Sequence, residues 1–253
     1  MNAGNGNTLS NLGRQNKDTE FQALKNTYSV CCTFDEIIPL NEIKEPLPPV
    51  PFKMVLAKHH SKSILHTKFS VYYAKVKGQY KGIKNVYYKK DLSLLQVYIL
   101  IIGLTFHNET NELRSFTDKR KAKDYKSKHF CYACFSGTFW SRANEKLITH
   151  SKLICIDLDH LGNDLQRVRK LINEDPQTIM SFISPSGEGL KVIFYIDPDK
   201  YSQGLYYRII SIYLTKKYNL RQEDIDPSGK DVSRACFLAY DPSAYLNLNF
   251  CQI

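Results

Sequence analysis

The sequence predicts an α+β fold in which helices pack on a small sheet whose elements follow one another in the order βαββαβ. Short apolar runs of strand length in residues 153–246 alternate with two segments whose apolar residues recur at helical spacing. The 253 residues, with 43% hydrophobic and 24% charged side chains, have the composition of a globular protein and suffice to bury a core.

The first part of the chain divides by composition. Residues 1–20 are polar and rich in Asn and Gly, which predicts a flexible tail without a signal peptide. Residues 21–107 form a basic and aromatic N-terminal region with a strand at 26–34, a Pro-rich extended connector at 44–52 and an apolar helix at 91–104. Asp91 or Ser93 would cap that helix, which is too short to span a bilayer. We therefore expect no membrane partner and a cytoplasmic location.

The cysteine pattern argues against a secreted disulfide framework. Seven cysteines are scattered along the chain, and the CxxC of Cys131 and Cys134 has no second pair at comparable spacing. Cys31 and Cys32 could complete a zinc site with this CxxC, although adjacent cysteines suit one tetrahedral ion poorly. Buried free thiols are the favoured interpretation.

The charge favours a polyanionic partner. The net charge is +10, and there are two basic runs at 75–90 and 114–128, the first with interleaved tyrosines. Single-stranded nucleic acid is bound by ammonium groups on phosphates and by aromatic rings that stack on bases. A solvated face of a basic helix at about 108–128 is the competing interpretation. The candidate nucleic-acid-binding residues are Lys119, Arg120, Lys121, Lys123 and Lys126.

Residues 108–253 contain the predicted βαββαβ region. A strand up to Phe135 ends at a Ser-Gly turn, and the region itself starts with the strand 153–159. A helix at 163–173, two strands within 178–196, a helix at 201–218 and a closing strand within 225–247 follow.

Two acids end the strand at 153–159. Because side chains alternate along a strand, Asp157 and Asp159 would lie on one face with Cα atoms roughly 6 to 7 Å apart. This spacing suits a shared divalent cation. Acids that are simply solvated at the end of a strand are the alternative.

A Gly-rich turn joins the two following strands. Ser184, Ser186, Gly187 and Gly189 predict a tight turn whose N–H groups approach phosphate oxygens, with Lys191 as a nearby cation. The pattern is weak by itself, and it is no Walker A loop because a strand follows.

A third acid comes after the second helix. Asp226, followed by Asp231 and Arg234, would complete a two-metal carboxylate site, and Asp231 rivals Asp226 as the third ligand. A capped turn explains the same residues without a metal.

These motifs together resemble a known family. The segments FSGTF, HSKLICIDLDHL, FISPSGEGLK, DPSGKDVSRACF and YDPSAYLN resemble the VirE N-terminal-domain family of bacterial mobile elements, and through it the archaeo-eukaryotic primase (primase–polymerase) superfamily. The resemblance covers about residues 108–250. It implies a primase–polymerase-like domain with an RRM-like sheet. It also implies metal ligands at Asp157, Asp159 and Asp226 and nucleotide contacts at the turn, Lys191 and Arg234.

The resemblance implies a nucleotidyltransferase that uses Mg²⁺ or Mn²⁺, nucleotide triphosphates and a single-stranded DNA template, with a replicative helicase as a possible partner. Lys191 stands where the superfamily commonly has a histidine, so phosphate binding is retained and proton relay is in doubt. Two alternatives stay open. One is a non-catalytic primase-like module that binds nucleic acid, and the other is a DxD phosphatase or glycosyltransferase.

Overall fold

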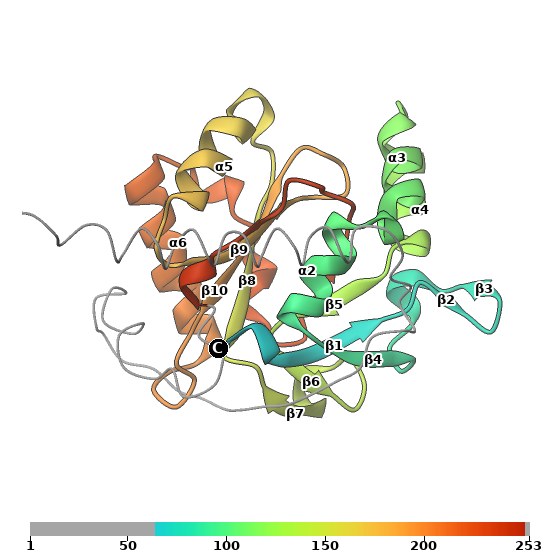
Figure 1. Cartoon of the computed structure of the whole chain (residues 1–253), viewed down its shortest axis with the longest axis horizontal. Helices are drawn as coiled ribbons and strands as arrows, with labels where there is room; N and C mark the ends of the chain where they lie inside the picture. The colour runs from blue at the N-terminus through green and yellow to red at the C-terminus, as the bar shows by residue number, and fades with distance from the viewer. Residues whose placement is uncertain (1–63, 251–253) are drawn as a thin grey trace, which may run out of the picture.

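The computed structural model describes residues 64–250, which form two four-stranded antiparallel sheets and five α-helices (Figure 1). The predicted tail, the strand at 26–34, the Pro-rich connector and three of the cysteines lie outside this range. An α+β fold is confirmed. None of the helices in the described range is long and apolar enough to cross a membrane.

The first sheet has the strand order β12-β9-β10-β8. Its strands are β8 (Leu153–Leu158), β9 (Thr178–Ile183), β10 (Leu190–Tyr195) and β12 (Tyr245–Leu246). Helix α5 (Leu165–Asn173) follows β8, and helix α6 (Gln203–Tyr218) follows β10, so the predicted βαββαβ order is present. The closing strand β12 pairs with β9, at the edge opposite β8.

The second sheet has the order β11-β5-β1-β4 and unites both parts of the chain. Its strands are β1 (Lys68–Tyr72), β4 (Lys89–Ser93), β5 (Tyr132–Cys134) and β11 (Cys236–Phe237). The N-terminal region supplies β1 and β4, and the later region supplies β5 and β11, so both regions share one sheet. Two hairpins extend from it, β2–β3 (Lys75–Val76 and Gln79–Tyr80) and β6–β7 (Gly137–Phe139 and Leu147–His150).

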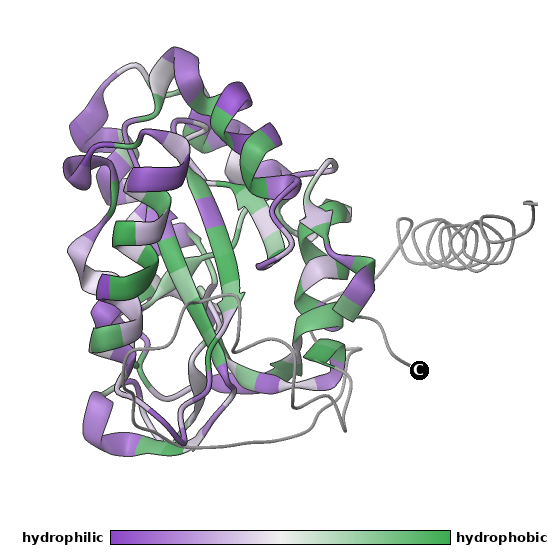
Figure 2. Ribbon diagram, turned by 90° about the vertical axis from the view of Figure 1, so that its left-hand side faces the viewer, coloured by the Kyte–Doolittle hydropathy of each residue, from purple (hydrophilic) through white to green (hydrophobic). Residues whose placement is uncertain are grey.

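Alternation along β8 divides the core into two layers. Ile154, Ile156 and Leu158 pack against α5 and α6, whereas Leu153 and Cys155 face the second sheet and α2 (Leu94–Ile102). Figure 2 shows apolar residues along these central strands and hydrophilic residues on the outer faces of the helices. Asp157 therefore lies on the face that looks toward the second sheet.

Helix boundaries follow capping side chains. Of the two predicted caps of α2, Ser93 is the one used, in a capping box with Gln96. The single basic helix expected at 108–128 is wrong, because the chain forms α3 (His107–Ser115) and α4 (Lys119–His129). Asp118 ends the continuity, since its carboxylate accepts the N–H groups of Arg120 and Lys121 at the start of α4.

A buried ion pair and buried free thiols complete the description of the core. Arg169 of α5 makes a buried ion pair with Asp241 at 2.8 Å and donates to the carbonyl of Ser243 at 2.6 Å. Cys134, Cys155 and Cys236 are buried free thiols, as predicted, whereas the free thiol of Cys131 is only half-buried.

Candidate active site

Three carboxylates converge at the C-terminal end of β8. Ligand oxygens of Asp157, Asp159 and Asp226 all lie within 4.8 Å of one another. They form the only such group of acidic, His or Cys side chains among residues 64–250, and Asp231 is not part of it. We call these three residues the acidic cluster.

Backbone pairing brings Asp226 to β8, although the two are far apart in the sequence. The Asp226 N–H donates to the carbonyl of Asp157 at 3.0 Å, and the Asp159 N–H donates to the carbonyl of Asp224 at 2.8 Å. Residues 224–226 therefore run along the outer edge of β8 like a short additional strand. The Asp226 carboxylate also accepts the N–H and the hydroxyl of Ser228, at 2.9 and 2.7 Å.

Sheet register places a cation opposite the first acid. Lys191 of β10 is the direct cross-strand partner of Asp157, and its ammonium contacts Oδ1 of that carboxylate. Both side chains are less than 10% exposed. Directly opposed residues of an antiparallel pair lie close enough for such contact. Lys191 thus neutralises Asp157 from within the sheet.

Arg234 bridges two members of the cluster. Its guanidinium contacts the Asp226 carboxylate and lies 3.3 Å from Oδ2 of Asp157, with 30% of the side chain exposed. Asp159 differs from both neighbours, because it makes no ion pair within the described part of the chain.

The pKa values of the acids reflect whether each carboxylate has an ion-pair partner. Burial, together with the charge of Asp157, raises the pKa of Asp159 above its ordinary value. Burial acts in the same direction on Asp226, but the two hydrogen bonds from Ser228 and the charges of Arg234 and Lys191 outweigh it and lower that pKa. For Lys191, burial is outweighed by the charge of Asp157, so its pKa is raised and the ammonium stays protonated at neutral pH.

The Gly-rich turn is attached to the acidic cluster. A Cβ on Gly189 would lie 2.3 Å from the carbonyl oxygen of Leu158 and 3.1 Å from Oδ1 of Asp159. Glycine is required there by close approach, while Gly187 adopts a left-handed conformation with φ of 82°. The turn predicted from the sequence is therefore present beside the acids.

The donors of this turn are only partly available to a ligand. The Gly187 N–H donates to the carbonyl of Ser184, and the Gly189 N–H donates to the hydroxyl of Ser184 at 3.1 Å. These two N–H groups are engaged within the turn, contrary to the expectation that they would contact phosphate. Ser186 and Glu188 are exposed, and their N–H groups have no acceptor within residues 64–250.

The predicted basic residues divide between the cluster and the surface. Lys119, Arg120, Lys121 and Lys123 are exposed on α4. Lys126 differs, because its ammonium is half-buried and its charge interacts with those of Lys191, Asp159 and Asp157. Burial and the like charge of Lys191 lower its pKa. One of the five residues thus faces the acidic cluster.

Two supporting contacts have no signal in the sequence. Arg114 of α3 donates to the carbonyls of Ser184 and Pro185 at 3.2 and 3.1 Å, which ties α3 to the Gly-rich turn. Gln203 of α6 donates to the carbonyls of Gly229 and Asp231 at 3.2 and 3.1 Å and so holds the loop that follows Asp226. Both residues are distant in sequence from the groups they position.

Comparison with known proteins gives one family. Neither the curated proteins nor the solved structures include a match. Residues 124–246, which extend from α4 to the end of β12 and contain the whole acidic cluster, match the family model described as BT4734-like, N-terminal domain.

Proposed function

We propose that this protein is a nucleotidyltransferase of the primase–polymerase type, which joins nucleotides on a single-stranded DNA template during replication of a mobile element. The convergence of Asp157, Asp159 and Asp226 at one end of a sheet supports this function best. The family match over residues 124–246 and the motif resemblance to VirE N-terminal domains and primases agree with it.

The donor set fits Mg²⁺ or Mn²⁺. All of the candidate ligands are carboxylate oxygens, which hard divalent cations prefer. Asp159 carries a raised pKa beside Asp157, so a cation would relieve an unfavourable crowding of negative charge. Bound at these three acids, the metal would supply the positive charge that polarises a triphosphate and lowers the pKa of an attacking hydroxyl.

The cationic side chains would bind and orient the nucleotide. Arg234 is partly exposed beside two of the acids, and a guanidinium matches the geometry of phosphate oxygens. Lys191 is buried and permanently charged, so its role is electrostatic and it does not relay protons. The exposed N–H groups of Ser186 and Glu188 offer further donors at the Gly-rich turn.

A non-catalytic module that binds nucleic acid and acts with a helicase is the second candidate. The observation in its favour is that Lys191 and Arg234 already neutralise Asp157 and Asp226. Such a site would hold a metal–nucleotide complex without turning it over.

The deciding experiment is template-dependent incorporation of labelled nucleotides with Mn²⁺ or Mg²⁺. We expect Asp157→Ala and Asp226→Asn to abolish synthesis, because each removes a candidate metal-ligand oxygen. Binding of single-stranded DNA should stay largely intact. Asp231→Ala is the matched control and should stay active, since Asp231 is not part of the cluster. Full synthesis by both cluster variants would contradict the proposal, and wild-type DNA binding without any incorporation would favour the non-catalytic module.

A further inference from the structure

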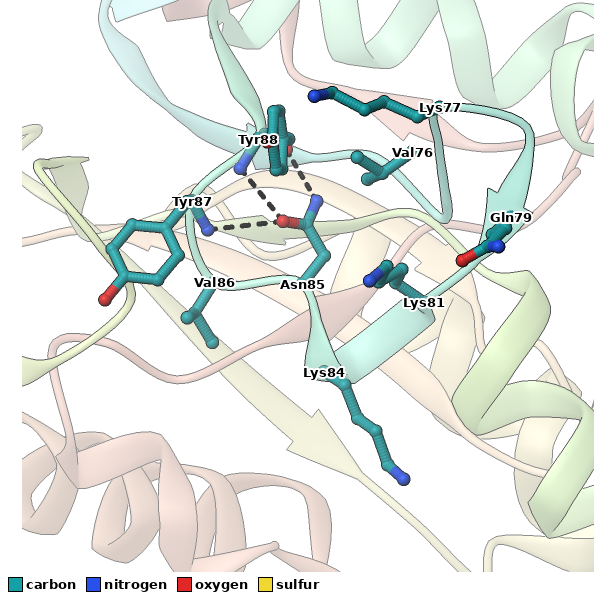
Figure 3. Close-up of a pocket in the computed structure, with 9 residues that line it drawn as sticks. All are labelled: Val76, Lys77, Gln79, Lys81, Lys84, Asn85, Val86, Tyr87 and Tyr88. Atoms are coloured by element: carbon teal, nitrogen blue, oxygen red, sulfur yellow. Dashed lines mark hydrogen bonds between the residues drawn. The ribbon is translucent and has the colours of Figure 1, made fainter.

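A second concave site lies away from the acidic cluster, on the β2–β3 side of the second sheet. It is a pocket of about 370 Å³ lined by the β2–β3 hairpin, the 3₁₀ turn Gly82–Lys84 and the segment that leads into β4 (Figure 3). Its lining includes Lys77, Lys81 and Lys84 and contains no acidic residue. The size is within the range of pockets that take small molecules or single nucleotides.

The charge of this pocket is uncompensated. All three lysines are exposed, and none of them makes an ion pair within residues 64–250. Isolated ammonium groups gathered at one concave surface attract phosphate groups. The pocket is therefore suited to an anion with several phosphates.

Aromatic side chains at the rim point to a nucleic acid in particular. Tyr87 and Tyr88 line the pocket and are 64% and 51% exposed. Exposed aromatic rings beside lysines are the combination that binds unpaired bases and their phosphates.

The rim is held rigidly. Asn85 is 4% exposed, and its side-chain oxygen accepts the N–H groups of Tyr87 and Tyr88 at 3.2 and 2.9 Å (Figure 3). Its amide nitrogen donates to the carbonyls of Tyr73 and Tyr88 at 2.9 and 2.6 Å. A preorganised loop loses little conformational entropy when it binds a ligand.

Helix α4 connects this pocket to the acidic cluster. A Cβ on Gly82 would lie 2.1 Å from the carbonyl oxygen of Ser127, so the 3₁₀ turn is in direct contact with α4. The neighbouring Lys126 interacts with the charges of Asp157 and Asp159. Helix α4 therefore contacts the pocket at Ser127 and faces the acidic cluster with Lys126. Its other lysines are exposed to solvent.

We propose that this pocket binds single-stranded nucleic acid, with Tyr87 and Tyr88 stacking on bases and Lys77, Lys81 and Lys84 contacting phosphates. Its use as a template site rests on the proposed function, whereas the binding itself does not. A strand held here would continue along α4 toward the acidic cluster.

The test is fluorescence anisotropy of the full chain with labelled oligo(dT) over a series of salt concentrations. We expect Tyr87→Ala/Tyr88→Ala to weaken binding by about tenfold or more, and Tyr87→Phe/Tyr88→Phe to bind like the wild type, because stacking needs the ring and not the hydroxyl. Lys81→Ala/Lys84→Ala should reduce the slope of log K against log salt by about 1.4.

A matched control is Lys170→Ala/Lys216→Ala, which removes the same charge from exposed positions on α5 and α6. The proposal is overturned if this control weakens binding as much as the pocket variants do, if the Ala and Phe variants behave alike, or if duplex DNA binds as tightly as oligo(dT). The pocket variants should raise the template concentration needed for half-maximal synthesis, and Asp157→Ala should retain binding. An inactive wild type would therefore refute the proposed reaction and leave the binding site standing.

Discussion

Asp159→Asn should distinguish two effects of the acidic cluster on stability, which are charge repulsion in the metal-free protein and stabilisation by a bound cation. Asp159 makes no ion pair in the described range, and one carboxylate at the 4.8 Å limit of the cluster would repel it by about 3.5 kcal/mol at an effective dielectric constant of about 20. The charges of Lys191 and Lys126 oppose this repulsion, and partial exposure screens it further. We take about 1 kcal/mol as the net destabilisation, so the amide should raise the melting temperature of the metal-free protein by about 2–4 °C.

The order of stability should reverse when metal is added. A cation at 100 times its Kd stabilises the wild type by about 2.7 kcal/mol, which corresponds to about 5–11 °C. Asp159→Asn loses a ligand oxygen and should show little of this shift. Thermal unfolding in EDTA and in Mn²⁺ at pH 7 measures both effects, and Asp231→Asn should keep the wild-type response. A variant that melts below the wild type in EDTA, or that keeps the full metal shift, would refute this reasoning.

Three further changes test the framework. Gly189→Ala should lower stability by about 2 kcal/mol and abolish the metal-induced shift in melting temperature, because its Cβ would press on the carbonyl of Leu158 between two of the ligands. Arg169→Met should cost about 3 kcal/mol in denaturant unfolding by leaving its buried carboxylate partner unpaired, whereas Arg167→Met removes an exposed pair and should cost under about 1 kcal/mol. Burial lowers the pKa of His150 to about 4, so stability should fall by about 3 kcal/mol as pH drops from 6.5 to 4, and His150→Asn should flatten that dependence; identical pH profiles would contradict it.

Local patterns were sufficient for much of the fold and for two of the three members of the acidic cluster, Asp157 and Asp159. The alternation in β8 predicted that Asp157 and Asp159 share a face, and the structure brings both together with Asp226. Helical periodicity located α5 and α6 to within two residues, and Ser93 was one of two predicted caps of α2. These features depend on interactions between near neighbours in sequence, which explains why the sequence alone predicts them.

The remaining features depend on register and on long-range packing. Lys191 lies opposite Asp157 because of the register in which β10 pairs with β8. A shift of that register by one residue would place a different side chain opposite Asp157. The ion pair of Lys191 with Asp157 and the engagement of two N–H groups inside the Gly-rich turn also follow from this pairing and from the turn conformation. The choice of Asp226 over Asp231 likewise required the backbone pairing with β8.

The segment 224–226 also affects whether the edge of the first sheet can pair with another chain. An edge strand with free backbone groups is a template on which another chain can add, and β8 forms one edge of its sheet. By bonding to the backbone of Asp157 and Asp159, this segment covers that edge where the acids lie. The residues that supply the third carboxylate therefore also protect this part of the edge from association with a foreign strand.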